Sequence, residues 1–153
     1  MQDAINELKG KVGAEINLGD WMTMEQELID TFSEASRDLQ WIHVDPERAA
    51  KESPFGATVA QGYLTLSMTT YLTGTLDPAT NPFPDAKVVI NYGLNKVRFP
   101  APVKAGSRIR ARTTLVAVEE IKGGVQVIKK VAVEIEGVDK PGCVAETVTR
   151  FYF

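Results

Sequence analysis

The sequence has few of the residues that build metal sites and disulfide frameworks. It contains one cysteine, Cys143, and one histidine, His43, among 153 residues. A single cysteine excludes an internal disulfide and a cysteine-based metal cluster. Structural zinc sites take four ligands, mostly from cysteine and histidine, so we expect no metal.

The sequence also lacks a long apolar run and a block of charge of one sign. No stretch approaches the roughly 20 apolar residues that span a bilayer. The segment MQDAINELKGKVG at the N-terminus is not an apolar signal segment, so we expect a cytoplasmic protein without a membrane partner. The basic residues are dispersed and the net charge is -3, which does not indicate a nucleic-acid partner.

Several other sequence signals are absent. No repeat, low-complexity tract or linker divides the chain, so we expect a single domain over residues 1–153. The G-x-S-x-G nucleophile elbow is missing, and so is a glycine-rich phosphate loop. The sequence therefore does not indicate a serine hydrolase of that type or nucleotide binding.

The first part of the chain is predicted to form short helices. Apolar residues recur at helical spacing over 24–36, and Thr23 with Gln26 reads as a capping box at the start of this helix. Asp45 followed by proline predicts a second helix over 46–51.

The second half of the chain is predicted to form long antiparallel strands. Apolar and polar residues alternate in segments bounded by proline and glycine, and Gly123-Gly124 predicts a hairpin. The expected strands cover 87–99, 107–121, 125–137 and 143–153. The residues expected on buried strand faces are Ile109, Ala111, Thr113, Leu115, Ala117, Val125, Val127, Val131, Val133 and Ile135.

The segment 60–73 precedes these strands and differs from the helices before it. It holds apolar and small hydroxyl residues and no charge, which predicts a central helix buried on nearly every side. A long antiparallel sheet wrapped around such a helix has one buried face. The predicted fold class is therefore α+β, a long antiparallel sheet wrapped around one buried central helix.

Asp38 and His43 form a candidate acid–base pair. Histidine exchanges a proton near neutral pH, and a carboxylate can share that work or hold the reacting water. Apolar surroundings from Trp41, Ile42 and Phe55 would strengthen their electrostatics. The alternative is that both residues serve only as turn or capping residues before the next helix.

Gly62 is a candidate donor for an oxyanion hole. It falls in the first turn of the expected central helix, where backbone N–H groups have no partner within the helix. These groups lie at the positive end of the helix dipole, and glycine lets a carbonyl oxygen approach closely. Such an N–H could stabilise a charged thioester oxygen. The alternative is that Gly62 only permits tight packing of the helix on the sheet.

Three blocks resemble the MaoC-like dehydratase family, the (R)-specific enoyl-CoA hydratases. Residues 38–46, DLQWIHVDP, match the spacing of Asp, His, Asp and Pro in the hydratase motif D-x-N-x-x-H-x-D. Residues 55–68 are similar to the block that enters the central helix, and 97–115 to the later strand–Pro–strand block. The first block is most similar to the nodulation-protein-N-like subgroup.

The resemblance implies a hot-dog enzyme of fatty-acid metabolism that hydrates trans-2-enoyl-CoA thioesters reversibly to (R)-3-hydroxyacyl-CoA. Asp38 and His43 would hold a water, one removing its proton and the other delivering a proton to C2. Gly62 would supply the oxyanion N–H, and Thr70 would support the catalytic Asp. The thioester is the substrate and no cofactor is implied. A homodimer or higher homo-oligomer is expected.

Further residues are expected to contact the substrate, and two differ from the family pattern. Phe55 and Tyr63 are expected to line the acyl tunnel. Gln40 stands where the family motif has Asn, and Gln61 stands where His often precedes the oxyanion glycine.

Two other functions fit the same fold, because fold alone does not choose the reaction. An acyl-CoA thioesterase is one alternative, although thioesterases of this fold usually carry a carboxylate on the central helix and 60–76 has none. A non-catalytic acyl-thioester-binding protein is the other.

Overall fold

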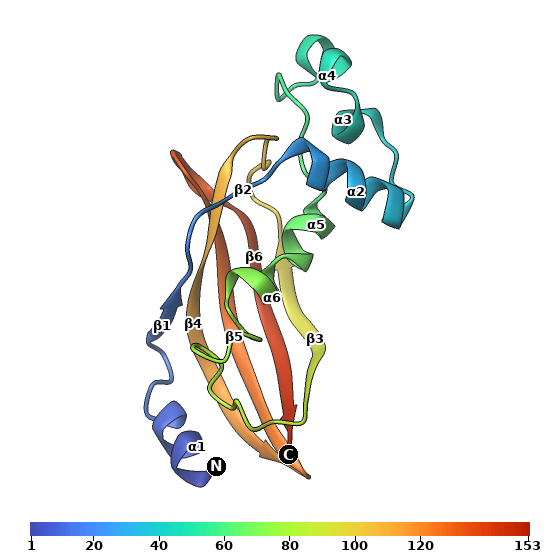
Figure 1. The fold of residues 1–153 in the computed structure, drawn as a ribbon. Helices are drawn as coiled ribbons and strands as arrows, with labels where there is room; N and C mark the ends of the chain where they lie inside the picture. The colour runs from blue at the N-terminus through green and yellow to red at the C-terminus, as the bar shows by residue number, and fades with distance from the viewer.

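The computed structural model describes residues 1–153 as a long, curved antiparallel sheet with short helices on one face and at both ends (Figure 1). The strand order is β1-β4-β5-β6-β3, and β2 pairs with β4 outside this path. The strands are β1 (Glu15–Leu18), β2 (Met22–Thr23), β3 (Val88–Arg98), β4 (Arg108–Ile121), β5 (Gly124–Ile135) and β6 (Val138–Tyr152). This arrangement leaves β3 at an edge of the sheet.

The four long strands lie where the alternating pattern predicts them, except that β6 begins at Val138 and not at 143, and the buried face of β4 needs one correction. The buried residues Ile109, Ala111, Thr113 and Leu115 share a face, but the register shifts between Leu115 and Ala117. A bulge adds one residue to one strand and so exchanges the two faces beyond it. Val118 is buried as a result, whereas Ala117 is only half-buried.

The helix predicted over 24–36 begins two residues later, the helix predicted over 46–51 ends one residue later, and helices lie at both ends of the sheet (Figure 1). At one end of the sheet lie α2 (Gln26–Ser36), α3 (Trp41–Val44) and α4 (Pro46–Glu52), and at the other end lies α1 (Gln2–Lys9). The N-cap of α2 is Glu25, so the predicted capping box is wrong. The Asp45 carboxylate caps α4 as predicted, by accepting a hydrogen bond from the N–H of Arg48. None of the helices is long and apolar enough to cross a membrane.

The predicted central helix is two helical segments, α5 (Gly62–Ser67) and α6 (Thr69–Leu72). Leu64, Thr65 and Leu72 are buried, but Tyr63 is 73% exposed and Tyr71 is 70% exposed. The prediction of burial on nearly every side is therefore wrong for the single chain. The sheet covers only one side of this pair of helices, so the tyrosines on the other side are left open.

The core between sheet and helices consists of two apolar clusters. The first includes Met24, Ile29, Leu64, Val131 and Val133, near the α2 end. The second includes Ile5, Leu8, Phe83, Val127 and Phe151, near α1. Buried polar residues lie between the two clusters, and we call them the polar layer: Thr73, Thr75, Thr113, Lys129 and Thr149.

Candidate active site

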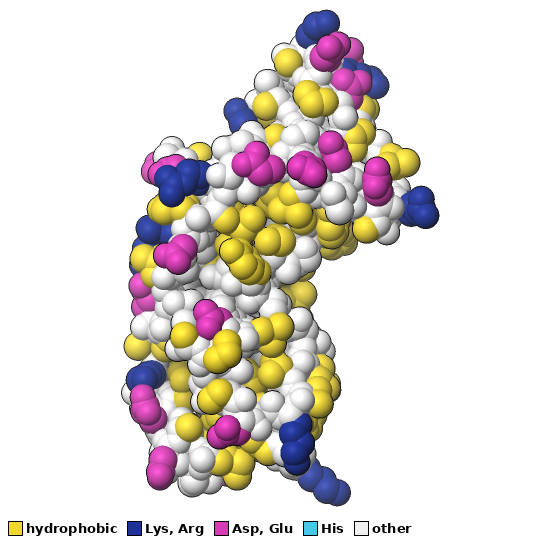
Figure 2. Space-filling model, in the orientation of Figure 1, with side chains coloured by type: hydrophobic (Ala, Val, Ile, Leu, Met, Phe, Trp, Pro, Cys, Tyr) yellow, Lys and Arg dark blue, Asp and Glu magenta, His cyan; other side chains and the backbone are white.

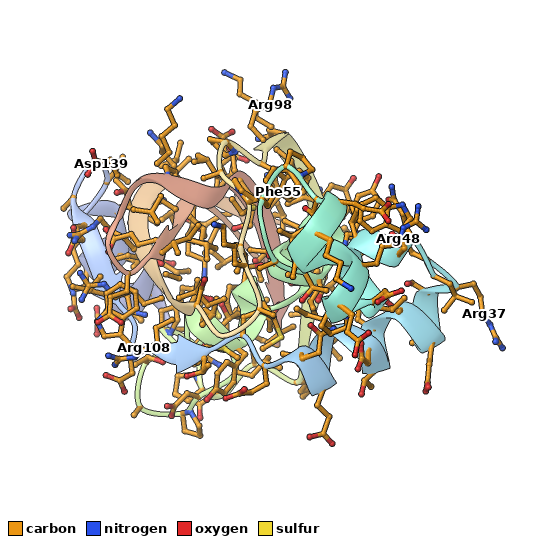
Figure 3. All side chains as sticks on the ribbon, turned by 90° about the horizontal axis from the view of Figure 1, so that it is seen from above. Arg37, Arg48, Phe55, Arg98, Arg108 and Asp139 are labelled. Carbon is orange, nitrogen blue, oxygen red and sulfur yellow. The ribbon has the colours of Figure 1, made fainter.

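The loop that carries Asp38 is shaped by the end of α2. Arg37 adopts a left-handed conformation with φ of 64°, which ends the helix and turns the chain. Its side chain points away from the molecule (Figure 3). Asp38 follows this turn, and α3 then begins after Gln40, whose carbonyl accepts a hydrogen bond from the N–H of His43. The turn and the short helix bring His43 back towards Asp38.

The imidazole of His43 is buried and held in one orientation. Its Nδ1 lies 2.6 Å from the backbone carbonyl oxygen of Val59. A carbonyl oxygen only accepts hydrogen bonds, so Nδ1 carries the hydrogen and Nε2 of the neutral ring has a free lone pair. Nε2 lies 3.7 Å from Oδ2 of Asp38. The histidine side chain is 8% exposed and the aspartate side chain 45% exposed, so the pair opens to solvent on the aspartate side.

A second set of hydrogen bonds supports the backbone beneath His43. Nε2 of Gln26 donates to the carbonyl oxygen of His43 at 2.7 Å and to Oδ1 of Asp30 at 2.8 Å. The hydroxyl of Thr58 donates to Oε1 of Gln26. Sequence reasoning assigned Gln26 to a helix cap and missed this role, because the contacts join α2 to His43 and to Thr58 only in the folded chain.

Gly62 is the first residue of α5. It stands three residues after Val59, whose carbonyl oxygen orients the His43 ring. A Cβ added at Gly62 would lie 3.0 Å from ring carbons of Phe99. The ring of Phe99 therefore covers the start of α5, and Tyr63 packs against it edge-on with ring centroids 6.4 Å apart. Sequence reasoning did not single out Phe99, which the resemblance covered only as part of a strand–Pro–strand block.

Gln61, just before Gly62, is 3% exposed. Its Nε2 donates to the hydroxyl of Ser33 at 2.6 Å, and its Oε1 has no hydrogen-bond partner. An unpaired buried amide oxygen carries a desolvation cost unless a ligand or water supplies a donor. Gln61 thus presents a free acceptor beside the start of α5.

The remaining predicted site residues differ in their exposure and in their contacts. Gln40 is exposed directly before α3, and Phe55 is half-buried in the loop after α4 (Figure 3). The hydroxyl of Thr70 accepts a hydrogen bond from Asn91 of β3 at 3.4 Å and makes none to Asp38. The structure therefore brings together Asp38 and His43 and does not place Thr70 on the Asp38 carboxylate. No group of three or more His, Cys, Asp or Glu side chains could hold a metal ion.

The curved sheet and the helices on one face define a hot-dog domain, in which Asp38 and His43 lie side by side. The MaoC like domain matches residues 7–136. The chain belongs to the MaoC-like dehydratase family and, with it, to the hydro-lyases.

Two curated relatives match over nearly their whole length. The 3-hydroxyacyl-thioester dehydratase Z of Mycobacterium tuberculosis (strain ATCC 25618 / H37Rv) is 45% identical over 150 residues, which cover 97% of this chain and 96% of that protein. Nodulation protein N of Rhizobium leguminosarum bv. viciae is 38% identical over 152 residues, which cover 98% of this chain and 92% of that protein. The predicted family and its nodulation-protein-N-like character are therefore confirmed.

One solved structure supports the fold independently of sequence. The (R)-hydratase from A. caviae involved in PHA biosynthesis superposes with a TM-score of 0.68, covering 87% of this chain and 95% of that one. At 21% identity this likeness shows the fold alone. It confirms the predicted α+β hot-dog class.

Proposed function

We propose that the protein catalyses the reversible addition of water to trans-2-enoyl-CoA thioesters, giving (R)-3-hydroxyacyl-CoA, as a cytoplasmic enzyme of fatty-acid metabolism. The observation that carries this proposal is the imidazole of His43, fixed by Val59 with its free Nε2 beside Asp38. Water and the thioester are the only reactants, so the reaction as proposed uses no cofactor.

The geometry of the pair suits one bound water. Nε2 and Oδ2 are 3.7 Å apart, too far for a direct hydrogen bond. A water beside the pair can donate one hydrogen to Nε2 of His43 and the other to the Asp38 carboxylate. Its oxygen then has a lone pair free to attack C3 of the enoyl group.

Proton transfer follows from the position of the hydrogen on His43. Because Nδ1–H is engaged with Val59, Nε2 accepts the proton of the water as its oxygen bonds to C3. The Asp38 carboxylate stabilises the imidazolium that forms. Nε2 then returns the proton to C2 on the same face, which gives syn addition and restores the starting state of the enzyme.

The thioester oxygen gains negative charge as C3 is attacked. Gly62 is the first residue of α5, so its N–H has no partner within that helix and can donate a hydrogen bond to this oxygen. We assign Phe99 and Tyr63 to contacts with the thioester, since their rings pack together over the start of α5. The free acceptor on Gln61 is available to a substrate N–H or a water.

Hydration of crotonyl-CoA tests this function. The expected result is loss of the absorbance of the conjugated thioester, with the (R)-3-hydroxy product identified by chiral chromatography. Release of free thiol without hydration would instead identify a thioesterase. If short, long and branched enoyl thioesters are all left unchanged, the hydratase function is wrong and an acyl-binding role replaces it.

We also propose that two chains form a homodimer through the β3 edge. The backbone groups along an edge strand are free to pair with another strand. The apolar side chains exposed on β3 and just after it are Val88, Ile90, Tyr92, Leu94 and Phe99. Apolar side chains also gather over the α5 region below α2 (Figure 2). A second copy would cover both the strand edge and the exposed tyrosines of α5 and α6.

The variant Ile90→Glu/Leu94→Glu is expected to separate this dimer. It places four carboxylates in the interface of two copies, and buried unpaired charges are strongly unfavourable. Light scattering after gel filtration should show the mass of a dimer for the wild type and of a monomer for the variant. Val138→Glu is the matched control, because Val138 is 48% exposed on another strand. A monomeric wild type, or a variant that keeps the dimer mass, would contradict the proposal.

A further inference from the structure

Lys129 is buried where the strand pattern calls for an apolar residue. It lies on β5 between Val127 and Val131, on the face that packs against the helices, and is 7% exposed. Its Nζ makes one hydrogen bond within the chain, to the hydroxyl of Thr75 at 3.0 Å. An ammonium group has three donors, so two remain without a protein partner.

A cavity of about 280 Å³ lies beside this ammonium group. One part of its wall is polar and consists of Lys129, Thr73, Thr75, Thr113, Asn17 and Thr80. The hydroxyl of Thr113 is buried and has no hydrogen-bond partner, so it is a second unsatisfied group on the same wall. The apolar part of the wall consists mainly of Leu8, Ile16, Val127 and Phe151.

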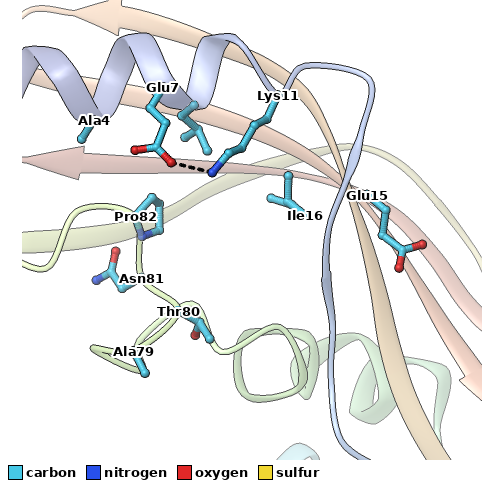
Figure 4. A pocket seen from close by; sticks show the side chains of 10 residues that line it. Ala4, Glu7, Lys11, Glu15, Ile16, Ala79, Thr80, Asn81 and Pro82 are labelled. Atoms are coloured by element: carbon cyan, nitrogen blue, oxygen red, sulfur yellow. Dashed lines mark hydrogen bonds and ion pairs between the residues drawn. The ribbon is translucent and has the colours of Figure 1, made fainter.

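This cavity adjoins a larger one of about 470 Å³ that opens at the surface between α1 and the 79–82 loop (Figure 4). The two cavities share the lining residues Leu8, Ile16, Ala79, Thr80 and Pro82. The cavity beside Lys129 therefore lies directly next to this opening at the α1 end of the molecule. Asp38 and His43 belong to the opposite end and line neither cavity (Figure 1).

We propose that the cavity beside Lys129 binds a small monocarboxylate with an apolar body, at a site separate from the Asp38–His43 pair. One carboxylate oxygen accepts from the Lys129 ammonium group and the other from the hydroxyl of Thr113. The hydrocarbon part lies against Leu8, Ile16, Val127 and Phe151. The cavity is slightly below the usual size of drug-sized ligand sites, which favours a short acid.

The charges around the site favour one anionic group. Lys129 is the only charged side chain that lines the 280 Å³ cavity. At the entrance, Glu7 pairs with Lys11 at 2.7 Å and Glu15 pairs with Arg112 at 2.6 Å, so these carboxylates are already balanced. A single cation and apolar walls suit a carboxylate better than a phosphate, which carries more charge and more acceptor oxygens.

Titration calorimetry with sodium hexanoate at pH 7 tests the proposal. We expect binding to the wild type and a loss of about 10- to 100-fold in affinity for Lys129→Met, the effect of removing one charge-assisted hydrogen bond. Thr113→Val, which keeps the shape of the side chain, should weaken binding by a smaller factor. Lys130→Met is the matched control and should bind like the wild type, because Lys130 is exposed.

Two further measurements on the wild type keep the test decisive if a variant does not fold. Hexanol has the same chain without the charge and should not bind. Burial lowers the pKa of the Lys129 ammonium group to about 8, so hexanoate affinity should fall as the pH rises above that value. Equal binding of hexanoate and hexanol, affinity that does not change with pH, or no hexanoate binding would overturn the proposal. So would unchanged affinity in a folded Lys129→Met variant.

Discussion

Asp38→Asn and His43→Ala are each expected to lower kcat for crotonyl-CoA hydration by about 10²- to 10⁴-fold, the usual contribution of a positioned acid or base. Asparagine keeps the size of the side chain but cannot balance the imidazolium that forms on His43. Alanine removes Nε2, the atom that accepts the proton. Steady-state kinetics with both variants measures the loss, and circular dichroism checks that the fold persists.

Asp45→Asn provides a matched control within the same short motif. The Asp45 carboxylate accepts the N–H of Arg48 at 3.0 Å and caps α4, so its role is structural. Asparagine caps helices about as well as aspartate. We therefore expect near wild-type kcat and stability for this variant. If Asp38→Asn behaves like Asp45→Asn, the proposed role of the Asp38 carboxylate in stabilising the His43 imidazolium is wrong.

The variant Lys129→Met is expected to be more stable than the wild type by about 3 kcal/mol at pH 7. Desolvation by burial lowers the pKa of Lys129 in the folded chain to about 8, against about 10.4 for a free lysine. Below pH 8 the ammonium is charged in both states, and the folded state carries the full cost of burying it. Methionine has a similar length and no charge, so it avoids this cost.

The same pKa shift predicts how the stability difference depends on pH. Between about pH 8 and 10.4 the unfolded chain binds the Lys129 proton and the folded chain has lost it, so wild-type stability gains with rising pH. The gap between Lys129→Met and the wild type should therefore close over this range. Urea unfolding at pH 7, 9 and 10.5 measures it, with Lys130→Met as the control. A gap that stays constant across these pH values would contradict the buried, destabilising charge.

The expected binding of hexanoate gives a reason for the presence of Lys129, a residue that is expected to lower the stability of the fold. A residue that lowers stability is retained when it serves another purpose, and binding sites commonly carry such groups. A bound carboxylate would offset the cost of the buried ammonium. Loss of hexanoate binding together with a gain in stability is the combined result that the structure leads us to expect in Lys129→Met.

Most of the sheet could be predicted from the sequence because its signal is local. Alternation with a period of two marks the buried face of β5, and Gly123-Gly124 marks the hairpin before it. The same alternation places position 129 on the buried face of β5. The charge of lysine argued for exposure, and only the packed helices and the 73–75 segment show that the face is covered there.

The proximity of Asp38 and His43 could be predicted from motif spacing, but the contacts that orient His43 could not. Asp38 and His43 are five residues apart in one motif. The partners that orient His43 come from elsewhere: the carbonyl of Val59 and the side chain of Gln26. A backbone carbonyl has no residue signature, and a glutamine near a helix start reads as a cap. These contacts depend on the tertiary fold.

The polar layer has a consequence for how the molecule opens. Continuous apolar packing makes a domain unfold as one unit, whereas regions with separate cores can open separately. Here the cluster around Ile5, Leu8 and Phe83 is divided from the cluster around Met24 and Ile29. We therefore expect subglobal unfolding, where it occurs, to begin at the α1 end, where it would admit small molecules to Lys129, while the helices around His43 stay closed.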